Sequence, residues 1–230
     1  MIKVQGISKI YQMGEVNATA LRNVSFTVED GEYVLLSGRS GSGKSTLLNI
    51  LTGVDKPSEG EVFIGTECIT DYTENQLAKW RGKNIGIVFQ FFQLIPTLSV
   101  LENILLPMDI VGTIAREQRD EKALGILKAL GMEKHKDKMP SALSGGEQQR
   151  VAIARSLAND AGVIFADEPT GNLDLENANK IYELLQKLNE QGKTIIMVSH
   201  EREDIPGVTR KIFLRDGQIM EDSKDEKTII

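Results

Sequence analysis

The first part of the chain alternates apolar and polar residues, which is the pattern of strands with one buried face. The clearest alternation covers residues 20–28, and shorter strands are predicted at residues 3–4 and 32–36. Asp30-Gly31 is typical of a tight turn between neighbouring strands. We therefore expect the chain to begin with antiparallel strands.

Later strands are predicted from continuous apolar runs, which are typical of strands buried on both faces of a parallel sheet. Runs of this kind occupy residues 84–89, 162–166 and 194–199, and shorter strands are predicted at 61–64, 211–214 and 218–220. The charged segment 221–227 is expected to form no regular structure.

Helical spacing of apolar residues dominates the stretch from residue 91 to 158, where prolines and glycines separate the segments. Helices are predicted at 46–51, 74–81, 100–108, 116–130, 146–157 and 175–191, with breaks at Pro96, Pro107, Gly131 and Pro140. The order of elements predicts an α/β fold with a mostly parallel core sheet and an N-terminal antiparallel β subdomain. A helical subdomain of about residues 91–160 is inserted in the core.

Length, charge and cysteine content restrict the number of domains, the partners and the cellular compartment that we expect. A chain of 230 residues with 40% hydrophobic content fits a single domain spanning 1–230. The net charge of −6 gives no electrostatic footprint for nucleic acid or for an anionic membrane surface, so either contact would have to be local or mediated by another protein. We expect no nucleic acid partner and no direct membrane insertion. Cys68 has no second cysteine to pair with, and no stretch approaches the roughly 18 apolar residues of a membrane span. The sequence therefore predicts a cytoplasmic protein, peripheral if it works at a membrane.

The most informative stretch is 38–45, which fits the phosphate-loop pattern G-x-x-x-x-G-K-[ST]. It lies between a predicted strand and a predicted helix, the context that such a loop requires. Glycines let backbone N–H groups converge on a phosphate, and the following helix N-terminus favours an anion. Lys44 is expected to reach the outer phosphates, and the Ser45 hydroxyl to bind Mg²⁺.

Two carboxylates, Asp167 and Glu168, follow the apolar run 162–166 at the sheet edge where such folds bind ligands. Taken alone, acids at a strand end more often cap the next turn. With a phosphate loop upstream, Asp167 is predicted to hold Mg²⁺ through the water shell of the ion, and Glu168 to orient or deprotonate an attacking water.

A second candidate anion-binding stretch is Ser144-Gly145-Gly146-Glu147, an N-cap that opens a predicted helix and leaves backbone N–H groups free for an anion. Taken alone, such a stretch is more often a plain capped helix. One γ-phosphate does not need two anion-binding stretches, or cradles, from the same chain, and residues 38–45 already provide one. In a two-fold dimer, the phosphate loop of one subunit and the second stretch of its partner can form one shared site, so both stretches are used.

Together these motifs resemble the ATP-binding cassette (ABC) ATPases, which are P-loop NTPases, and they follow that family's order over nearly the whole chain. The resemblance implies an ATP-hydrolysing subunit that dimerises on binding ATP and Mg²⁺ and drives an integral-membrane permease from the cytoplasmic face. It implies ATP contacts from Tyr11, Gly38, Arg39, Ser40, Gly41, Ser42, Gly43, Lys44, Ser45, Thr46 and Gln90, and metal ligands at Ser45, Gln90 and Asp167. Catalytic roles fall on Glu168, His200 and Lys44, while Ser144, Gly145, Gly146 and Glu147 act on the partner subunit's site and Asp174 couples the two sites.

Finer features are similar to the macrolide-export, lipoprotein-release and cell-division branch of the family. Phe89, Phe91 and Phe92 beside Gln90 form an apolar cluster that can dock a permease helix or simply pack the helical subdomain. Arg39 stands where the family commonly has proline, and Glu201 follows His200 where an aspartate is usual.

Two alternatives come from other functional classes. The first is an ABC ATPase that acts on DNA or ribosomes, but no sustained heptads lie between residues 47 and 142 and the chain is acidic. The second is a nucleotide-dependent cell-division scaffold whose hydrolysis is incidental. We assign no role to Cys68 or His135.

Overall fold

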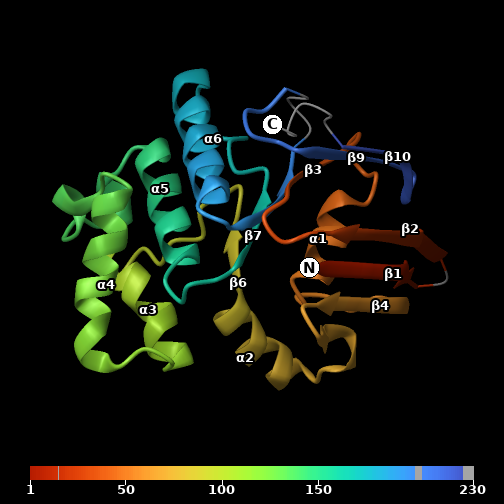
Figure 1. The fold of residues 1–230 in the computed structure, drawn as a ribbon, viewed down its shortest axis with the longest axis horizontal. Helices are drawn as coiled ribbons and strands as arrows, with labels where there is room; N and C mark the ends of the chain where they lie inside the picture. The colour runs from red at the N-terminus through yellow and green to blue at the C-terminus, as the bar shows by residue number, and fades with distance from the viewer. Residues whose placement is uncertain (15, 200–203, 225–230) are drawn as a thin grey trace.

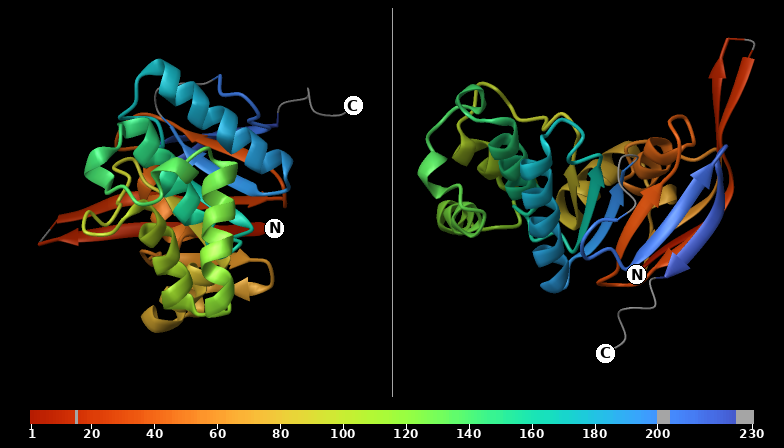
Figure 2. Two further views of the ribbon diagram at one scale, coloured as in Figure 1. Left: turned by 90° about the vertical axis from the view of Figure 1, so that its left-hand side faces the viewer. Right: turned by 90° about the horizontal axis from the view of Figure 1, so that it is seen from above.

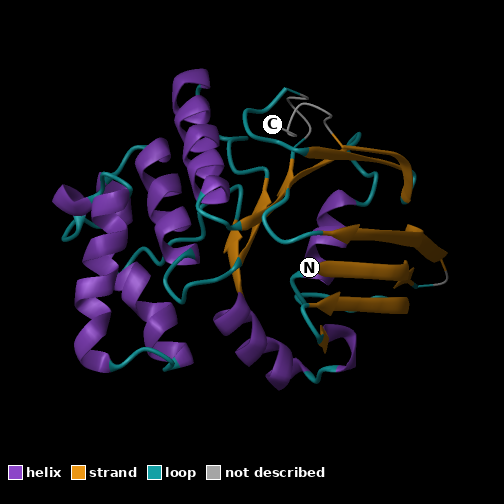
Figure 3. Cartoon of the chain, in the orientation of Figure 1, coloured by secondary structure: helices purple, strands orange, loops and turns teal. Residues whose placement is uncertain are grey.

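The computed structural model describes residues 1–14, 16–199 and 204–224. Its strands form two sheets (Figures 1 and 3). The smaller sheet has the order β2-β1-β4-β5 and is antiparallel throughout, as predicted. Its strands are β1 (Ile2–Met13), β2 (Val16–Val28), β4 (Glu59–Ile64) and β5 (Glu67–Cys68).

The larger sheet has six strands in the order β10-β9-β3-β8-β7-β6. They are β3 (Tyr33–Ser37), β6 (Ile85–Val88), β7 (Val163–Asp167), β8 (Thr194–Val198), β9 (Arg210–Arg215) and β10 (Gln218–Lys224). All neighbours pair in parallel except β10, which pairs antiparallel to β9. The carboxyl ends of β3 and β7 therefore meet at one edge of the sheet, where such folds bind ligands.

Helices cover both faces of the large sheet (Figures 1 and 3). They are α1 (Lys44–Leu51), α2 (Glu74–Asn84), α3 (Val100–Val111), α4 (Arg116–Ala129), α5 (Gly145–Ser156) and α6 (Leu175–Glu190), with short 3-10 turns η1 (Ile69–Asp71), η2 (Glu133–His135) and η3 (Pro140–Ala142). Helices α3 to α6 lie on one face, and α1 lies on the other. Helices α3, α4 and α5 form the predicted helical group.

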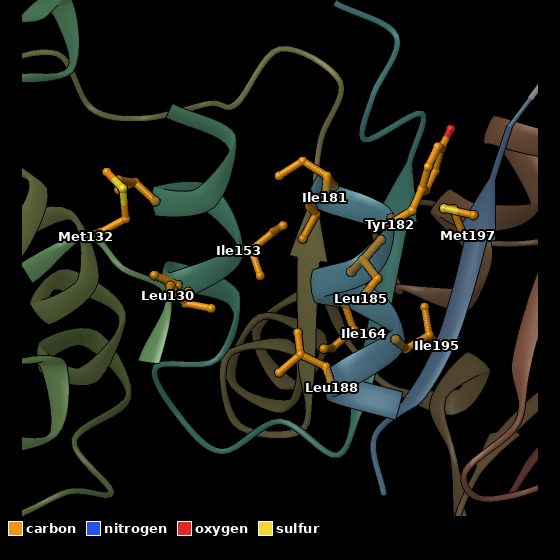
Figure 4. Close-up of a cluster of buried hydrophobic side chains, with 14 of the residues drawn as sticks. Leu130, Met132, Ile153, Ile164, Ile181, Tyr182, Leu185, Leu188, Ile195 and Met197 are labelled. Carbon is orange, nitrogen blue, oxygen red and sulfur yellow. The ribbon is translucent and has the colours of Figure 1, made fainter. Parts of the chain in front are cut away.

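The large sheet separates two hydrophobic cores, because successive side chains of its strands point to opposite faces. On β3, Tyr33 and Leu35 join the core beneath α3 to α6, whereas Val34 and Leu36 join the core beneath α1 and the small sheet. Strands β7 and β8 alternate in the same way. Figure 4 shows the first core, in which Tyr182 and Leu185 of α6 lie against Ile195 of β8 and its neighbours.

Several boundaries differ from the sequence expectation. Pro107 was expected to end a helix but lies inside α3. A proline removes one backbone hydrogen bond, and burial of Ile104 and Met108 on either side of it keeps the helix docked.

The expectation that segment 221–227 is irregular is wrong for its first four residues, which belong to β10. Arg210 of β9 holds Asp222 with two hydrogen bonds, from Nε to Oδ1 at 2.6 Å and from Nη2 to Oδ2 at 2.7 Å. This bidentate pair extends the hairpin beyond its apolar residues. Within the described residues, no helix is long and apolar enough to cross a membrane.

Candidate functional site

The segment 38–45 joins the end of β3 to the start of α1, as its pattern predicts. Gly38 and Gly43 have φ of 147° and 102°, in the region that favours glycine. A Cβ at Gly38 would lie 2.2 Å from the Leu214 carbonyl oxygen, and one at Gly43 would lie 2.6 Å from that of Ala20. The loop is therefore packed so closely against β9 and β2 that neither position accepts a side chain.

Lys44 is folded back onto this loop. Its Nζ donates hydrogen bonds to the carbonyl oxygens of Gly38, at 2.8 Å, and Arg39, at 3.0 Å, and the residue is only 6% exposed. Burial lowers the pKa of the Lys44 ammonium, while the charges of Glu168 and Asp167 act to raise it. The loop is thus shaped around a positive charge before any ligand arrives.

A cavity of about 290 Å³ opens over the loop and the N-terminus of α1. It brings together much of the predicted phosphate site with one predicted catalytic acid from β7. The lining residues are Ser40, Gly41, Gly43, Lys44, Ser45, Thr46 and Glu168. Backbone N–H groups at the helix start and the Lys44 ammonium suit this cavity to a polyphosphate.

Asp167 ends β7 beside this cavity. Burial and the neighbouring charge of Glu168 raise the pKa of the Asp167 carboxyl, while a hydrogen bond from Ser45 and the charge of Lys44 act to lower it. Its Oδ1 is buried and has no hydrogen-bond partner within the described part of the chain. A buried carboxylate oxygen without a donor is suited to a cation.

The chemistry of the donors fits Mg²⁺. The described residues contain no group of three or more His, Cys, Asp and Glu side chains able to hold a metal by themselves. Mg²⁺ is commonly held by one or two protein oxygens together with substrate phosphates, and the Ser45 hydroxyl and the Asp167 carboxylate supply two.

Glu168 has a positive φ of 46°, and its backbone N–H donates to the Val198 carbonyl oxygen at 3.0 Å. This bend carries the chain off the sheet at the residue that lines the cavity. A non-glycine residue held in the left-handed region marks strain of the kind concentrated at functional sites.

Gln90 lies close to this edge of the sheet but is not among the residues that line the 290 Å³ cavity. Its carbonyl oxygen accepts a hydrogen bond from the Asn172 side chain at 2.9 Å, and its Nε2 lies 2.9 Å from where a Cβ of Gly171 would be. The structure therefore places Gln90 against the turn that follows Glu168.

Tyr11, on β1, also lies outside that lining, and it is 37% exposed. Burial and a hydrogen bond to Asp55 raise the pKa of its hydroxyl, while a hydrogen bond with the Thr46 side chain acts to lower it. Its ring is thus close to the first turn of α1, at the rim of the phosphate cavity.

The predicted second cradle has the N-cap geometry expected from its sequence. The Ser144 N–H and hydroxyl both donate to Glu147 Oε2 at 2.7 Å, and Ser144 Oγ accepts from the Glu147 N–H at 3.4 Å. This capping box fixes the start of α5. The hydrogen bonds from Ser144 lower the pKa of the Glu147 carboxyl.

Sequence reasoning missed His135, whose Nε2 lies 3.5 Å from Glu147 Oε1. Its Nδ1 is buried and has no partner within the described ranges. The two residues are twelve positions apart and no spacing rule connects them, so only the fold brings this imidazole to the capping box.

The predicted coupling residue, Asp174, lies beside the same cradle. It caps α6 by accepting from the Asn177 backbone N–H at 2.9 Å and from the Asn177 amide at 2.7 Å. A Cβ at Gly146 would lie 2.8 Å from Asn177 Oδ1, so the starts of α5 and α6 are in contact. His200, the remaining predicted site residue, lies outside the described residues.

Within one chain, the two cradles start helices on opposite faces of the large sheet (Figure 1). Leu47 and Leu51 of α1 belong to one core, and Val151 and Ile153 of α5 belong to the other. The sheet itself separates the two helices, so the second cradle takes no part in the lining of the 290 Å³ cavity.

The match to a family model decides the relationship: residues 21–171 fit the model described as ABC transporter. This chain belongs to the ABC transporter family. It is an ABC ATP-binding subunit and an ATPase, so the predicted family, fold class and enzymatic activity are confirmed.

Its relatives span almost its full length. An uncharacterized ABC transporter ATP-binding protein of Thermotoga maritima is 47% identical, with 95% of this chain and 93% of the relative covered. The macrolide export ATP-binding/permease protein MacB of Syntrophobacter fumaroxidans is 42% identical over 97% of this chain and 32% of its own length. MacB fits the predicted branch and favours the transporter role over the DNA, ribosome and scaffold alternatives.

Among solved structures, the cassette MJ0796 was captured as a dimer in a post-hydrolysis state bound to ADP and Pi. It has a TM-score of 0.89 and 45% identity to this chain, and it covers 97% of this chain and 98% of its own. A second dimeric structure of MJ0796 has the same TM-score and 46% identity, over 97% and 98% of the two chains.

Proposed function

We propose that two copies of this chain dimerise head to tail around two ATP molecules and drive an integral-membrane permease. Each ATP lies between the phosphate loop of one copy and the Ser144–Glu147 cradle of the other. The single observation that carries the dimer is the separation of the two cradles by the large sheet within one chain. The dimeric relatives support it.

Lys44 and the loop backbone bind the triphosphate in this proposal. The ammonium is preorganised by its hydrogen bonds to Gly38 and Arg39 and exchanges these for phosphate oxygens when ATP binds. Ser45 and Asp167 hold Mg²⁺, and Gln90 joins the metal only if its side chain leaves the Gly171 turn. When bound, Mg²⁺ neutralises charge on the β- and γ-phosphates.

Glu168 orients the attacking water and accepts its proton. Its carboxylate lines the phosphate cavity, opposite the ammonium of Lys44, and its strained backbone fixes the direction from which it reaches the γ-phosphate. His200 is assigned the contact with the γ-phosphate, and Tyr11 the stacking contact with adenine. Asp174 couples the two sites through the contact between α5 and α6.

A groove of about 340 Å³ beside β6 is the proposed dock for a cytoplasmic helix of the permease. It is lined by residues of α2, β6, α3 and α5, among them Phe89, Pro107 and Arg155. Two large apolar side chains on the segments that contribute to the groove are exposed, Phe91 at 68% and Ile110 at 75%, although neither is among the residues that line it. Exposed apolar side chains beside a groove are typical of a partner site. Because the proposed dock binds a cytoplasmic helix of the permease, the chain would act on the cytoplasmic face of the cell membrane and would not insert into the bilayer.

The test of the nucleotide site is calorimetry with ATP on the Lys44→Ala variant. Loss of the ammonium removes the charge that the loop is shaped around, so we expect ATP binding to become undetectable at concentrations that saturate the natural chain. An unchanged ATP affinity in this variant, with the fold intact by circular dichroism, rules out the proposed site.

A further inference from the structure

Among the described residues, no third strand pairs with the outer part of the β1–β2 ribbon. Strand β4 pairs with β1 only as far as Ser8, which lies opposite Glu59, whereas Tyr11 pairs with Ala18 further out. Figure 2 shows the end of this ribbon projecting from the rest of the molecule. Two-stranded ribbons are marginally stable in water, so the ladder alone does not fix the position of the Tyr11 ring.

Asp55 supplies the missing support. Tyr11 Oη donates to Asp55 Oδ2 at 2.8 Å, and Lys9 Nζ donates to Asp55 Oδ1 at 2.7 Å. The Lys56 backbone N–H also donates to Oδ1, at 2.7 Å. One carboxylate therefore holds two side chains of the ribbon.

Asp55 is in turn fixed to the helix that begins at the phosphate loop. Its backbone N–H and that of Val54 both donate to the Asn49 carbonyl oxygen, at 3.1 and 2.8 Å. Asn49 belongs to the last turn of α1, whose first residue is Lys44. A continuous path thus runs from the phosphate loop along α1 to Asp55 and on to the Tyr11 hydroxyl.

Lys9 completes the arrangement. Its side chain is 12% exposed, and its Nζ lies 4.8 Å from the centroid of the Tyr11 ring while also donating to the Lys56 carbonyl oxygen at 2.6 Å. The ammonium attracts the ring electrostatically and lies over one of its two faces. Burial acts to raise the pKa of the Asp55 carboxyl, but the hydrogen bonds from Lys9, Tyr11 and Lys56 outweigh it and lower the pKa.

We propose that Asp55 is a positioning residue that holds the Tyr11 ring at a fixed separation from the phosphate loop, so that base and triphosphate are bound together. The inference rests on the proposed function of Tyr11 as the adenine contact. Asp55 touches no part of the nucleotide itself. Its effect therefore falls on binding of the base and leaves the chemistry at the γ-phosphate unaltered.

Two variants test the proposal in an ATPase assay. Tyr11→Phe keeps the ring and removes the hydroxyl, which contacts both Asp55 and the Thr46 side chain. Asp55→Ala removes the tether from the other side and leaves the Thr46 contact in place. Each is expected to raise the KM for ATP about tenfold, the scale of one hydrogen bond to a charged acceptor, with kcat unchanged. The double variant is expected to raise the KM by less than the product of the two single effects, because both substitutions remove the Tyr11–Asp55 hydrogen bond. Asp71→Ala, an exposed acid on η1, is the matched control and is expected to change neither constant.

Inorganic tripolyphosphate has no base, so its binding reports on the phosphate loop alone and distinguishes an effect on that loop from an effect on the base contact. Its inhibition constant is expected to be equal in the natural chain and in Asp55→Ala. Weaker tripolyphosphate binding in Asp55→Ala overturns the inference, because Asp55 would then act on the phosphate loop through α1. A Tyr11→Phe variant with the natural KM overturns it as well. Failure of the natural chain to bind either ATP or tripolyphosphate overturns the proposed function instead.

Discussion

Asn103 is the residue whose loss most directly tests how the segment after Gln90 is held. It is fully buried at the start of α3. Its Oδ1 accepts from the Ile95 N–H at 2.8 Å, and its Nδ2 donates to the carbonyl oxygens of Ile95, Leu98 and Ser99 at 3.2, 3.0 and 2.9 Å. At the other end of this segment, Arg155 donates to the Phe92 carbonyl oxygen at 3.0 Å. The exposed Phe91 thus directly precedes a segment that is fixed at both ends.

The cost of Asn103→Ala follows from which backbone groups lose their only partner. The Ile95 carbonyl oxygen keeps the Leu98 N–H, and that of Ser99 keeps the Asn103 N–H. The Ile95 N–H and the Leu98 carbonyl oxygen keep no other partner among the described residues. Both groups belong to half-buried residues, and two orphaned groups at about 1–3 kcal/mol each give an expected loss of about 2–6 kcal/mol in the free energy of unfolding.

Urea unfolding in the absence of ATP measures this change. Asn84→Ala is the matched control, because Asn84 makes a single side-chain hydrogen bond, to the Trp80 carbonyl oxygen at 3.0 Å, and should lose under about 1 kcal/mol. Asn103→Asp should be worse than Asn103→Ala, since it turns a buried oxygen toward three carbonyl oxygens. Equal losses in Asn103→Ala and Asn84→Ala, or a harmless Asn103→Asp, would refute the reasoning.

Three further predictions concern the cation, the phosphate loop and the groove. Because the pKa of Asp167 is raised, its carboxyl protonates at a higher pH than an ordinary aspartate, so Mg²⁺ affinity measured with ATP bound should fall as pH is lowered toward that pKa. A rise in affinity on acidification contradicts this. Gly43→Ala should abolish ATP binding, whereas Gly125→Ala, in an open helical position of α4, should stabilise the chain by about 0.5–1 kcal/mol in thermal unfolding. Phe91→Glu should release the chain from permease-containing membranes in flotation assays while its basal ATPase rate is kept, and co-flotation at the natural level counts against the groove.

The parts of the fold that sequence reasoning predicted best are those in which local pattern and tertiary burial agree. Most of the run predicted at residues 162–166 is buried on both faces in β7, from residue 163 to 166, and the pattern at 38–45 forms a loop between β3 and α1. The need for glycine at a tight loop, the residues that start a helix and the spacing of apolar residues are local properties. They can therefore be recognised in a single sequence.

The parts that the sequence did not reveal depend on contacts between distant residues. Ile2–Met13 is a long strand because β2 and β4 pair along it, although its own alternation predicts only a short one. The tether from Asp55 to Tyr11 and the approach of His135 to Glu147 join segments with no common motif. The metal-binding role that the resemblance implies for Gln90 stays a prediction, and the contact of its side chain with Gly171 is one that the sequence does not signal.

The central claim is that each ATP site is shared by two copies of the chain, and sedimentation of Glu168→Gln tests it most directly. Removing the catalytic carboxylate should retain ATP without turnover, so this variant is predicted to sediment as a dimer with ATP and as a monomer without it. Adding Ser144→Arg should return it to a monomer, because the bulky side chain blocks the cradle that receives the partner's nucleotide. A monomer at saturating ATP, or a dimer indifferent to Ser144→Arg, would contradict the shared site.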